Sequence, residues 1–232
     1  MSSGFFGFYA HAGMLKALEQ EDLHPAAVAG SSAGALVAGM YAAGMSAADL
    51  CEELVTLERR EFWDPWPGLG LLRGHKFRRR LEQAIGTRDF SECRVPLAVS
   101  VFDVAARKTD VIKAGDVASA VVASCALPIL IQPQRRGGRL YSDGGILDRP
   151  GLLGLEQAPR VLHHHLVSRS PWRRKNSKAL EAPARDGLVA LLLPDLPRLG
   201  PFRLERGRMA LKDAYQRTRA ALDLEAGPVV HG

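Results

Sequence analysis

The chain has 232 residues, a length that suits one full α/β domain, and its 47% hydrophobic and 24% charged residues are typical of a globular protein. Three widely spaced cysteines (Cys51, Cys93 and Cys125) argue against a disulfide framework or a zinc ribbon and favour a reducing compartment, so we expect a cytoplasmic protein. The net charge of +6 is carried by scattered basic clusters such as Arg78–Arg80. Because no aromatic residues are interleaved with these clusters, a nucleic-acid partner is not expected. Transient contact with a membrane surface is still compatible with the charge.

Helical and strand patterns alternate along the chain, and no apolar run is long enough to cross a membrane. The first predicted helix ends near Leu18. The other predicted helices span Ala35–Ala43, Ser46–Glu61, His75–Ile85, Asp116–Cys125 and Leu204–Leu222. The predicted strands span Ala26–Ala29, Val95–Val104, Lys108–Lys113, Val161–Val167 and Gly187–Leu193, and Trp63–Leu72 is predicted to be an apolar loop. We therefore expect an α/β fold with a mostly parallel sheet and helices on both faces, in a single domain over residues 1–232.

The segment around Ser32 has the pattern of a nucleophile elbow. A short apolar run leads into Gly30-Ser31-Ser32-Ala33-Gly34, and a helical segment of small residues follows. In a G-x-S-x-G elbow, a sharp strand-to-helix turn exposes the serine hydroxyl, and the flanking Gly30 and Gly34 leave room for the tight packing of the turn. The same serine could instead be a plain helix N-cap. The strand before it and the helix after it favour a nucleophile.

Two further segments could complete such a site. The glycine-spaced loop at the amino terminus runs into a helix, and its backbone N–H groups could hold an anion. Asp143 is followed by Gly144 and Gly145, which would allow a sharp turn that brings its carboxylate close to another loop. Taken alone, Asp-Gly-Gly is also a common turn.

Together, these segments resemble the patatin-like phospholipases in order and spacing. The resemblance rests on residues 4–18, on 30–34, on Ser124-Cys125-Ala126-Leu127-Pro128 and on Tyr141-Ser142-Asp143-Gly144-Gly145 with Pro150. It implies a three-layer α/β/α fold and a Ser-Asp dyad, with Ser32 as nucleophile and Asp143 as base. It also implies an oxyanion hole of backbone N–H groups around Ser3, Gly4 and Phe5. The implied substrate is a lipid or another carboxylic ester, cleaved through an acyl-enzyme without a cofactor or a metal.

The chain departs from the family pattern in two ways. The family's oxyanion loop usually has three consecutive glycines and a basic residue, whereas Ser2, Ser3 and Phe6 occupy those positions here. The family also has an apolar strand ahead of this loop, and we expect that strand to be missing from this chain because the true start lies upstream. A catalytically impaired lipid-binding module is therefore an alternative to the enzyme.

Three consecutive histidines, His163, His164 and His165, allow two other hypotheses. One of them could complete a Ser-Asp-His triad with Ser32 and Asp143. On a strand, His163 and His165 share one face and His164 lies on the other, so a metal site would lack an evident third ligand. The simplest interpretation is that the three histidines lie on a partly exposed strand without a catalytic role.

Overall fold

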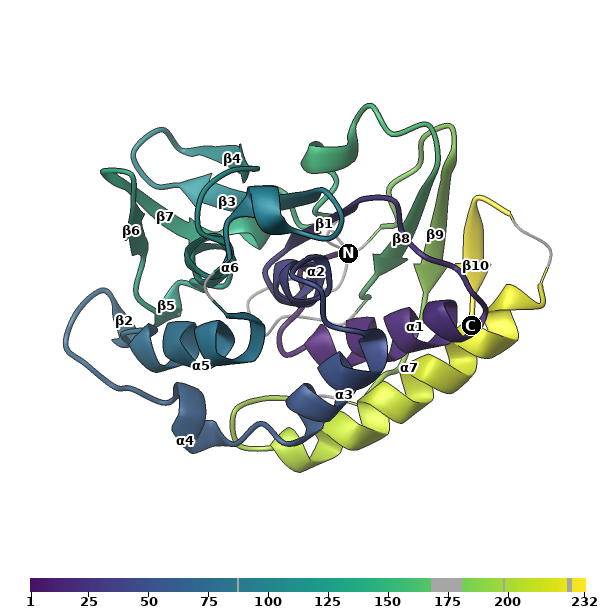
Figure 1. Cartoon of the computed structure of the whole chain (residues 1–232), viewed down its shortest axis with the longest axis horizontal. Coiled ribbons are helices and arrows are strands. Elements are labelled where there is room, and N and C mark those ends of the chain that lie inside the picture. Colours follow the sequence, from purple (N-terminus) through teal and green to yellow (C-terminus); the bar gives the residue numbers. More distant parts are fainter. Residues whose placement is uncertain (87, 168–180, 198, 225–226) are drawn as a thin grey trace.

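The computed structural model describes residues 1–86, 88–167, 181–197, 199–224 and 227–232 (Figure 1). Its main sheet contains β1 (Val28–Ser31), β3 (Leu97–Asp103), β4 (Lys108–Ile112), β6 (Gln134–Arg136) and β7 (Arg139–Asp143). In this sheet β1 and β3 run parallel, while the β3–β4, β3–β7 and β6–β7 pairs are antiparallel. The prediction of a mostly parallel sheet is therefore wrong. The short connections at residues 104–107 and 137–138 form hairpins, because a parallel crossover needs a longer segment.

Strand β3 organises this sheet by using both of its edges. One edge pairs with β4, from Val99↔Ile112 to Asp103↔Lys108. The other edge is shared, since β1 pairs with its first half up to Ser31↔Ser100, and β7 pairs with its second half from Val101↔Asp143 onward. Because β1 runs parallel to β3 and β7 runs antiparallel, the carboxyl ends of β1 and β7 meet at the middle of β3.

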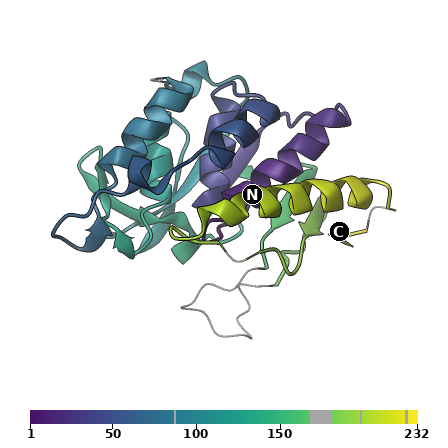
Figure 2. The same ribbon diagram turned by 90° about the horizontal axis from the view of Figure 1, so that it is seen from below.

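Helices α2 (Ala33–Ala42) and α6 (Val117–Ser124) pack against this sheet and against each other. Helix α6 consists of small and β-branched residues, and α2 contributes Gly39 to the contact, so the two axes can approach closely. A Cβ atom at Gly39 would lie 2.6 Å from Cγ2 of Val121. Helices α1 (Phe8–Gln20) and α3 (Ala47–Val55) complete the core on the outer side of α2. The long α7 (Gly207–Leu222) runs alongside α1 (Figure 2).

A second sheet contains the parallel strands β8 (Val161–His165), β9 (Leu188–Leu192) and β10 (Val229–His231). The first two residues of the chain join it to the main sheet. The Met1 amino group donates to the Ala29 carbonyl at 2.9 Å, and the Ser2 N–H donates to the His164 carbonyl at 3.2 Å. No strand precedes α1 among the described residues, and Met1 and Ser2 lie between β1 and β8 instead.

The segment predicted as one helix, Ser46–Glu61, forms α3 and a separate short α4 (Arg59–Phe62). The Thr56 hydroxyl donates to the Glu52 carbonyl at the end of α3, and Glu58 then caps α4 together with Glu61. These side-chain caps compete with continuation of the helix. The basic helix α5 (His75–Ile85) is confirmed with its predicted bounds.

The predicted loop Trp63–Leu72 ends in a strand, β2 (Gly70–Leu72), which pairs in parallel with β5 (Ile129–Ile131). Short 3-10 turns make up most of the remaining regular structure: η1 (Phe90–Glu92), η2 (Gly144–Ile146), η3 (Leu153–Leu155) and η5 (Leu204–Arg206). No helix in the described ranges is both long and apolar enough to cross a bilayer.

Candidate active site

Ser32 lies at the sharp turn between β1 and α2, as the G-x-S-x-G pattern predicts. Its backbone has φ 53° and ψ −117°, a conformation that residues with a side chain seldom adopt and that marks strain at functional turns. The Ser32 carbonyl accepts the Leu36 N–H at 3.0 Å, so the serine sits directly at the first turn of α2. The turn directs the hydroxyl away from the end of β1 and towards β7.

The glycines around this turn are required for space. A Cβ atom at Gly30 would lie 2.3 Å from the Gly34 carbonyl carbon, and one at Gly34 would lie 2.2 Å from the Met1 carbonyl oxygen. Gly144 and Gly145 play the same role after β7, where a Cβ atom would lie 2.1 Å from the Ser100 carbonyl oxygen and 2.2 Å from Ser3 Oγ, respectively. All four glycines therefore permit close contacts. None of them has a positive φ, so a left-handed backbone conformation is not the reason for glycine at these positions.

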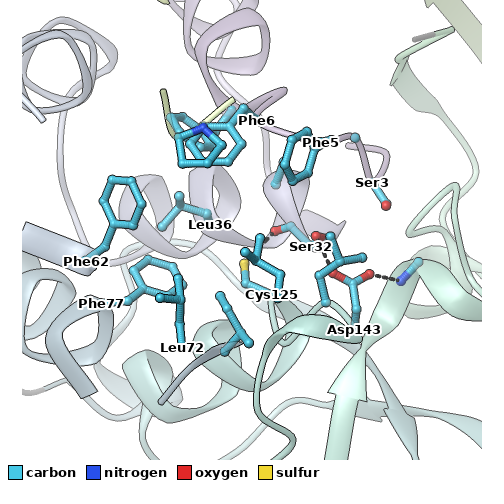
Figure 3. Close-up of a pocket in the computed structure, with 18 of the residues that line it drawn as sticks. Ser3, Phe5, Phe6, Ser32, Leu36, Phe62, Leu72, Phe77, Cys125 and Asp143 are labelled. Atoms are coloured by element: carbon cyan, nitrogen blue, oxygen red, sulfur yellow. Dashed lines mark hydrogen bonds between the residues drawn. The ribbon is translucent and has the colours of Figure 1, made fainter. Parts of the chain in front are cut away.

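Asp143 is the last residue of β7 and faces Ser32 across the point where β1 and β7 meet. The Ser32 hydroxyl donates a 2.6 Å hydrogen bond to Asp143 Oδ2, and the Gly145 N–H donates to Asp143 Oδ1 at 2.8 Å (Figure 3). The carboxylate is 3% exposed. One oxygen thus contacts the serine while a backbone donor holds the other, which fixes the orientation of the carboxylate.

Helix α6 supports the elbow from below. The Ser124 hydroxyl accepts the Ser32 N–H at 2.8 Å and donates to the Ser100 carbonyl at 2.7 Å, so it ties the elbow to β3. Ser124 belongs to the motif quoted from the sequence, which did not indicate this contact. The neighbouring Cys125 thiol donates to the Ser32 carbonyl at 3.2 Å, and burial, reinforced by the Asp143 carboxylate, raises its pKa well above the ordinary value. Cys125 is therefore a protonated structural thiol and a poor nucleophile.

The predicted oxyanion loop lies beside Ser32, but its three N–H groups differ. Ser3 donates its N–H to the Arg149 carbonyl at 2.8 Å, so this donor is already engaged. The N–H groups of Gly4 and Phe5 have no acceptor within the described part of the chain, and both residues line the pocket next to Ser32. At the start of α2, the Ala33 N–H also has no intrahelical acceptor. Donors for an anion are thus present around Ser32 without the contribution of Ser3.

Ser32 and Asp143 line an apolar pocket with a volume of about 560 Å³. Figure 3 shows the two residues at one end of the pocket and Phe62, Leu72 and Phe77 at the other. Further apolar side chains from α2, α3 and α5 line the pocket, among them Leu36, Met40, Leu54 and Leu81. Arg80 and Glu53 also line the pocket, and Arg80 forms ion pairs with Glu53 at 2.5 Å and with Glu61 at 3.0 Å. The cavity has the size and composition of a site for a largely apolar ligand.

Strand β8 is partly exposed as expected, at Leu162, but the three histidines themselves are fully buried. The predicted alternation is confirmed: His163 Nε2 lies 3.4 Å from His165 Nδ1, while His164 Nδ1 lies 2.9 Å from Nδ1 of His11 on α1. Helix α1 explains the burial of His164, because His11 of α1 packs against that face of β8. Of the pocket-lining residues in the described structure none is a histidine, and no cluster of three potential metal ligands occurs in the ranges described.

The patatin-like phospholipase family matches residues 1–155 of the chain. An uncharacterized NTE family protein of Mycobacterium bovis is 32% identical over 151 residues, covering 64% of this chain and 42% of that protein. Lysophospholipase NTE1 of Cryptococcus neoformans is 25% identical over 155 residues, covering 64% of this chain and 10% of that protein. The chain therefore spans less than half the length of these curated relatives.

The fold itself is also found among solved structures. The crystal structure of VipD from Legionella pneumophila superposes with a TM-score of 0.68 at 16% identity, covering 96% of this chain and 66% of that chain. This likeness concerns the fold alone, and it extends through the second sheet and α7, beyond the residues that the family match covers. With the match over residues 1–155, the chain belongs to the patatin-like phospholipase family.

Proposed function

We propose that the protein is a serine acyl hydrolase that cleaves lipid or other carboxylic esters with a Ser32–Asp143 dyad. The observation that carries this proposal is the 2.6 Å hydrogen bond from Ser32 Oγ to Asp143 Oδ2 at one end of an apolar pocket. A serine needs a base within hydrogen-bond reach to become a nucleophile, and a pocket of this kind suits an acyl chain. The family to which the chain belongs, and a relative named as a lysophospholipase, support a lipid substrate.

In the proposed reaction, Asp143 accepts the Ser32 proton as Oγ attacks the ester carbonyl. The N–H groups of Gly4, Phe5 and Ala33 stabilise the negative oxygen of the tetrahedral intermediate, with about 3 kcal/mol lost when one such donor is removed. The intermediate then collapses, the C–O bond to the alcohol breaks, and the protonated Asp143 returns its proton to the leaving oxygen. A water molecule, deprotonated by Asp143, hydrolyses the acyl-enzyme in the second half of the reaction.

The direct test is labelling with a fluorophosphonate, followed by identification of the modified peptide by mass spectrometry. We expect labelling at Ser32 that is lost in Ser32→Ala and in Asp143→Asn, with kcat on a soluble ester reduced about 10⁴-fold in both variants. Since Asp143→Asn has nearly the same shape, it is the matched variant for the role of the charge. Labelling that persists in Asp143→Asn would rule out the dyad.

A second test uses the length of the acyl chain. Each CH₂ group that enters the pocket contributes about 0.8 kcal/mol, so kcat/KM should rise by up to about fourfold per added CH₂ in a homologous ester series.

Separate His163→Gln, His164→Gln and His165→Gln variants should keep Ser32 labelling, because His164 contacts His11, and His163 and His165 contact each other. Loss of labelling in one folded histidine variant would instead favour the Ser-Asp-His triad.

The engaged N–H of Ser3 supports a second candidate, a lipid-binding module with impaired catalysis. It predicts that the folded protein binds a fluorescent fatty acid in the apolar pocket but shows neither labelling nor ester turnover. Leu36→Trp and Leu81→Trp, which would fill the pocket, should weaken that binding. Turnover that depends on both Ser32 and Asp143 would exclude this candidate.

A further inference from the structure

Beside the pocket, the two-stranded β2–β5 sheet carries large apolar side chains that point into solvent. Leu69 is 78% exposed, Ile129 69%, Trp66 57% and Leu71 49%. They belong to one small unit, since Gly70 pairs with Ile129, the Trp66 N–H donates to the Leu71 carbonyl at 3.0 Å, and Gln132 Nε2 donates to the Trp66 carbonyl at 3.1 Å. Clustered exposed apolar side chains of this kind mark a site of interaction, whereas single ones do not.

The alternation of β2 shows that this exposure is not a by-product of covering the pocket. Leu72 is buried and lines the pocket, and Leu71, on the opposite face of the strand, points outward. Only one apolar face is needed to cover the cavity. The second apolar face of this sheet therefore needs another explanation.

Ile129 gives independent support, because the backbone is strained at this residue. The Leu130 N–H donates to the Leu127 carbonyl at 3.1 Å around Pro128 and Ile129, and Ile129 has φ +72°. A turn with proline at its second position and positive φ at its third is type II, which favours glycine at the third position. A β-branched residue there is an outlier, and the strain places an apolar side chain at the exposed rim of the pocket.

Positive charge lies next to this unit. A groove next to it is lined by His75, Arg78, Arg79 and Glu82 of α5 and by Gln134 and Arg135 of β6. Gln134 Nε2 donates to the Arg73 carbonyl at 3.2 Å, and the Arg73 guanidinium lies 5.1 Å from the Trp66 ring centre. Arg78 is paired with Glu82 and Asp116. By contrast, no carboxylate of the described residues lies within ion-pairing distance of Arg73, Arg79 or Arg135. Apolar side chains at a pocket mouth with unpaired cations at their border match the interface of an anionic membrane.

We propose that the β2–β5 unit, with Trp66, Leu69, Leu71 and Ile129, inserts into the surface of an anionic phospholipid membrane while Arg73, Arg79 and Arg135 contact the headgroups. This orientation would turn the pocket mouth at Ile129 towards the lipid. That a lipid ester then enters the pocket rests on the proposed function, whereas membrane binding itself does not.

The test measures flotation with vesicles in the Ser32→Ala background, so that hydrolysis plays no part. Binding to phosphatidylcholine vesicles with 30% phosphatidylglycerol should exceed binding to pure phosphatidylcholine at least tenfold, and it should weaken as NaCl is raised from 0.05 to 0.5 M. Leu69→Ser combined with Leu71→Ser should reduce binding at least tenfold. Arg79→Ala and Arg135→Ala should each reduce it about fivefold, and only with the anionic vesicles.

Ile129→Gly separates membrane binding from folding. Glycine relieves the positive φ, so the melting temperature should stay equal or rise while vesicle binding falls. The matched control is Leu162→Ser, since Leu162 is 45% exposed on β8, at the other end of the molecule from β2 and β5 (Figure 1), and its loss should leave binding unchanged.

Three outcomes would overturn the proposal. The first is equal binding to neutral and anionic vesicles, and the second is equal loss of binding in Leu162→Ser and in the Leu69/Leu71 variant. The third is a dimer in solution, seen by light scattering, that the Leu69/Leu71 variant dissociates while the wild-type chain fails to float with vesicles. That result would assign the surface to a second copy of the chain.

Discussion

At the scale of single residues, the site depends on Ser124, a residue of the family motif to which the sequence analysis assigned no role. Ser124 is fully buried and satisfies both the Ser32 N–H and the Ser100 carbonyl. Without it, the Ser32 N–H and the buried Ser100 carbonyl would lose this partner, and the strained backbone of Ser32 would lose one of the contacts that hold it. Strained conformations at functional turns persist only when such contacts over-determine them.

We therefore expect Ser124→Ala to lower the free energy of unfolding by about 1–3 kcal/mol, the cost of leaving a buried polar group unsatisfied. If the backbone of the elbow at Ser32 also relaxes, kcat on a soluble ester should fall while KM changes little. Ser124→Thr, which keeps a hydroxyl group, should restore part of kcat. Urea unfolding and steady-state kinetics measure the two effects. The control is Ser119→Ala on the same helix, where the hydroxyl contacts no hydrogen-bond partner in the described residues; an equal loss there would contradict the assigned role.

At the scale of elements, the packing of α1 against α7 links the two parts of the chain. Helix α7 lies beyond residues 1–155, the part that matches the family, and it packs along α1, which follows the predicted oxyanion loop. The contact is close because of a glycine: a Cβ atom at Gly13 would lie 2.3 Å from the Leu211 carbonyl oxygen and 3.0 Å from the Tyr215 nitrogen. Backbone atoms cannot move aside as a flexible side chain can, so α7 itself would have to shift.

Gly13→Ala is accordingly expected to destabilise the protein, although alanine is the better helix former by about 1 kcal/mol. The overpacking cost of about 1–3 kcal/mol should exceed this gain, and chemical denaturation would measure the difference. Ala10→Gly on the same helix is a reference in which glycine replaces a buried alanine, and it should lower stability by at least about 1 kcal/mol, since a buried methyl group is lost together with helix propensity. An increase in stability for Gly13→Ala would show that α7 is not held against α1 as described.

At the scale of the whole molecule, buried histidines lie where α1 and the two sheets meet. Burial, together with the neighbouring positive groups, lowers the pKa of His163 to about 2 and that of His164 to about 3, and lowers that of His11 well below its ordinary value. The Met1 amino group lies in the same region, and burial lowers its pKa to about 5. The joint between the sheets therefore consists of neutral bases at neutral pH.

This arrangement predicts that stability falls as the pH drops below about 6.5. In that range the unfolded chain takes up protons on these histidines, while the folded protein does not until the pH approaches 3. Each histidine that stays neutral in the folded protein thus lowers the free energy of unfolding by about 1.4 kcal/mol per pH unit below 6.5, which amounts to about 2 kcal/mol at pH 5. Thermal unfolding between pH 7.5 and 5 measures this slope.

The matched variant is His164→Gln, which removes one of the buried bases and should make the slope shallower. Substitution of the exposed His24 by Gln is the control, and it should leave the slope as in the wild type. A melting temperature independent of pH between 7.5 and 5 would contradict the assignment of neutral buried histidines.

Local pattern was sufficient for the parts of the protein that depend on nearby residues. The elbow at Ser32, helix α5 and the alternation of His163 to His165 follow from spacing and small residues, because turn and helix geometry are set by a few consecutive positions. The role of Gly30 and Gly34 in making space was also readable from the sequence, whereas Gly144 and Gly145, expected to allow a sharp turn, make space as well. Shared motifs then related Asp143 to Ser32 before any distance was known.

The tertiary structure decided what depends on contacts between distant segments. Whether the main sheet is parallel or mixed depends on the direction in which each strand runs beside β3, as the parallel β1 and the antiparallel β7 show on one edge, and the hydrophobic pattern is the same in both cases. The engaged N–H of Ser3 depends on Arg149, a residue far along the chain, and the burial of His164 depends on its contact with His11 of α1. Sequence thus specified the residues that can form the site, and the pairing of β1 and β7 along β3 placed Ser32 and Asp143 in contact, since only the packed chain determines how distant segments meet.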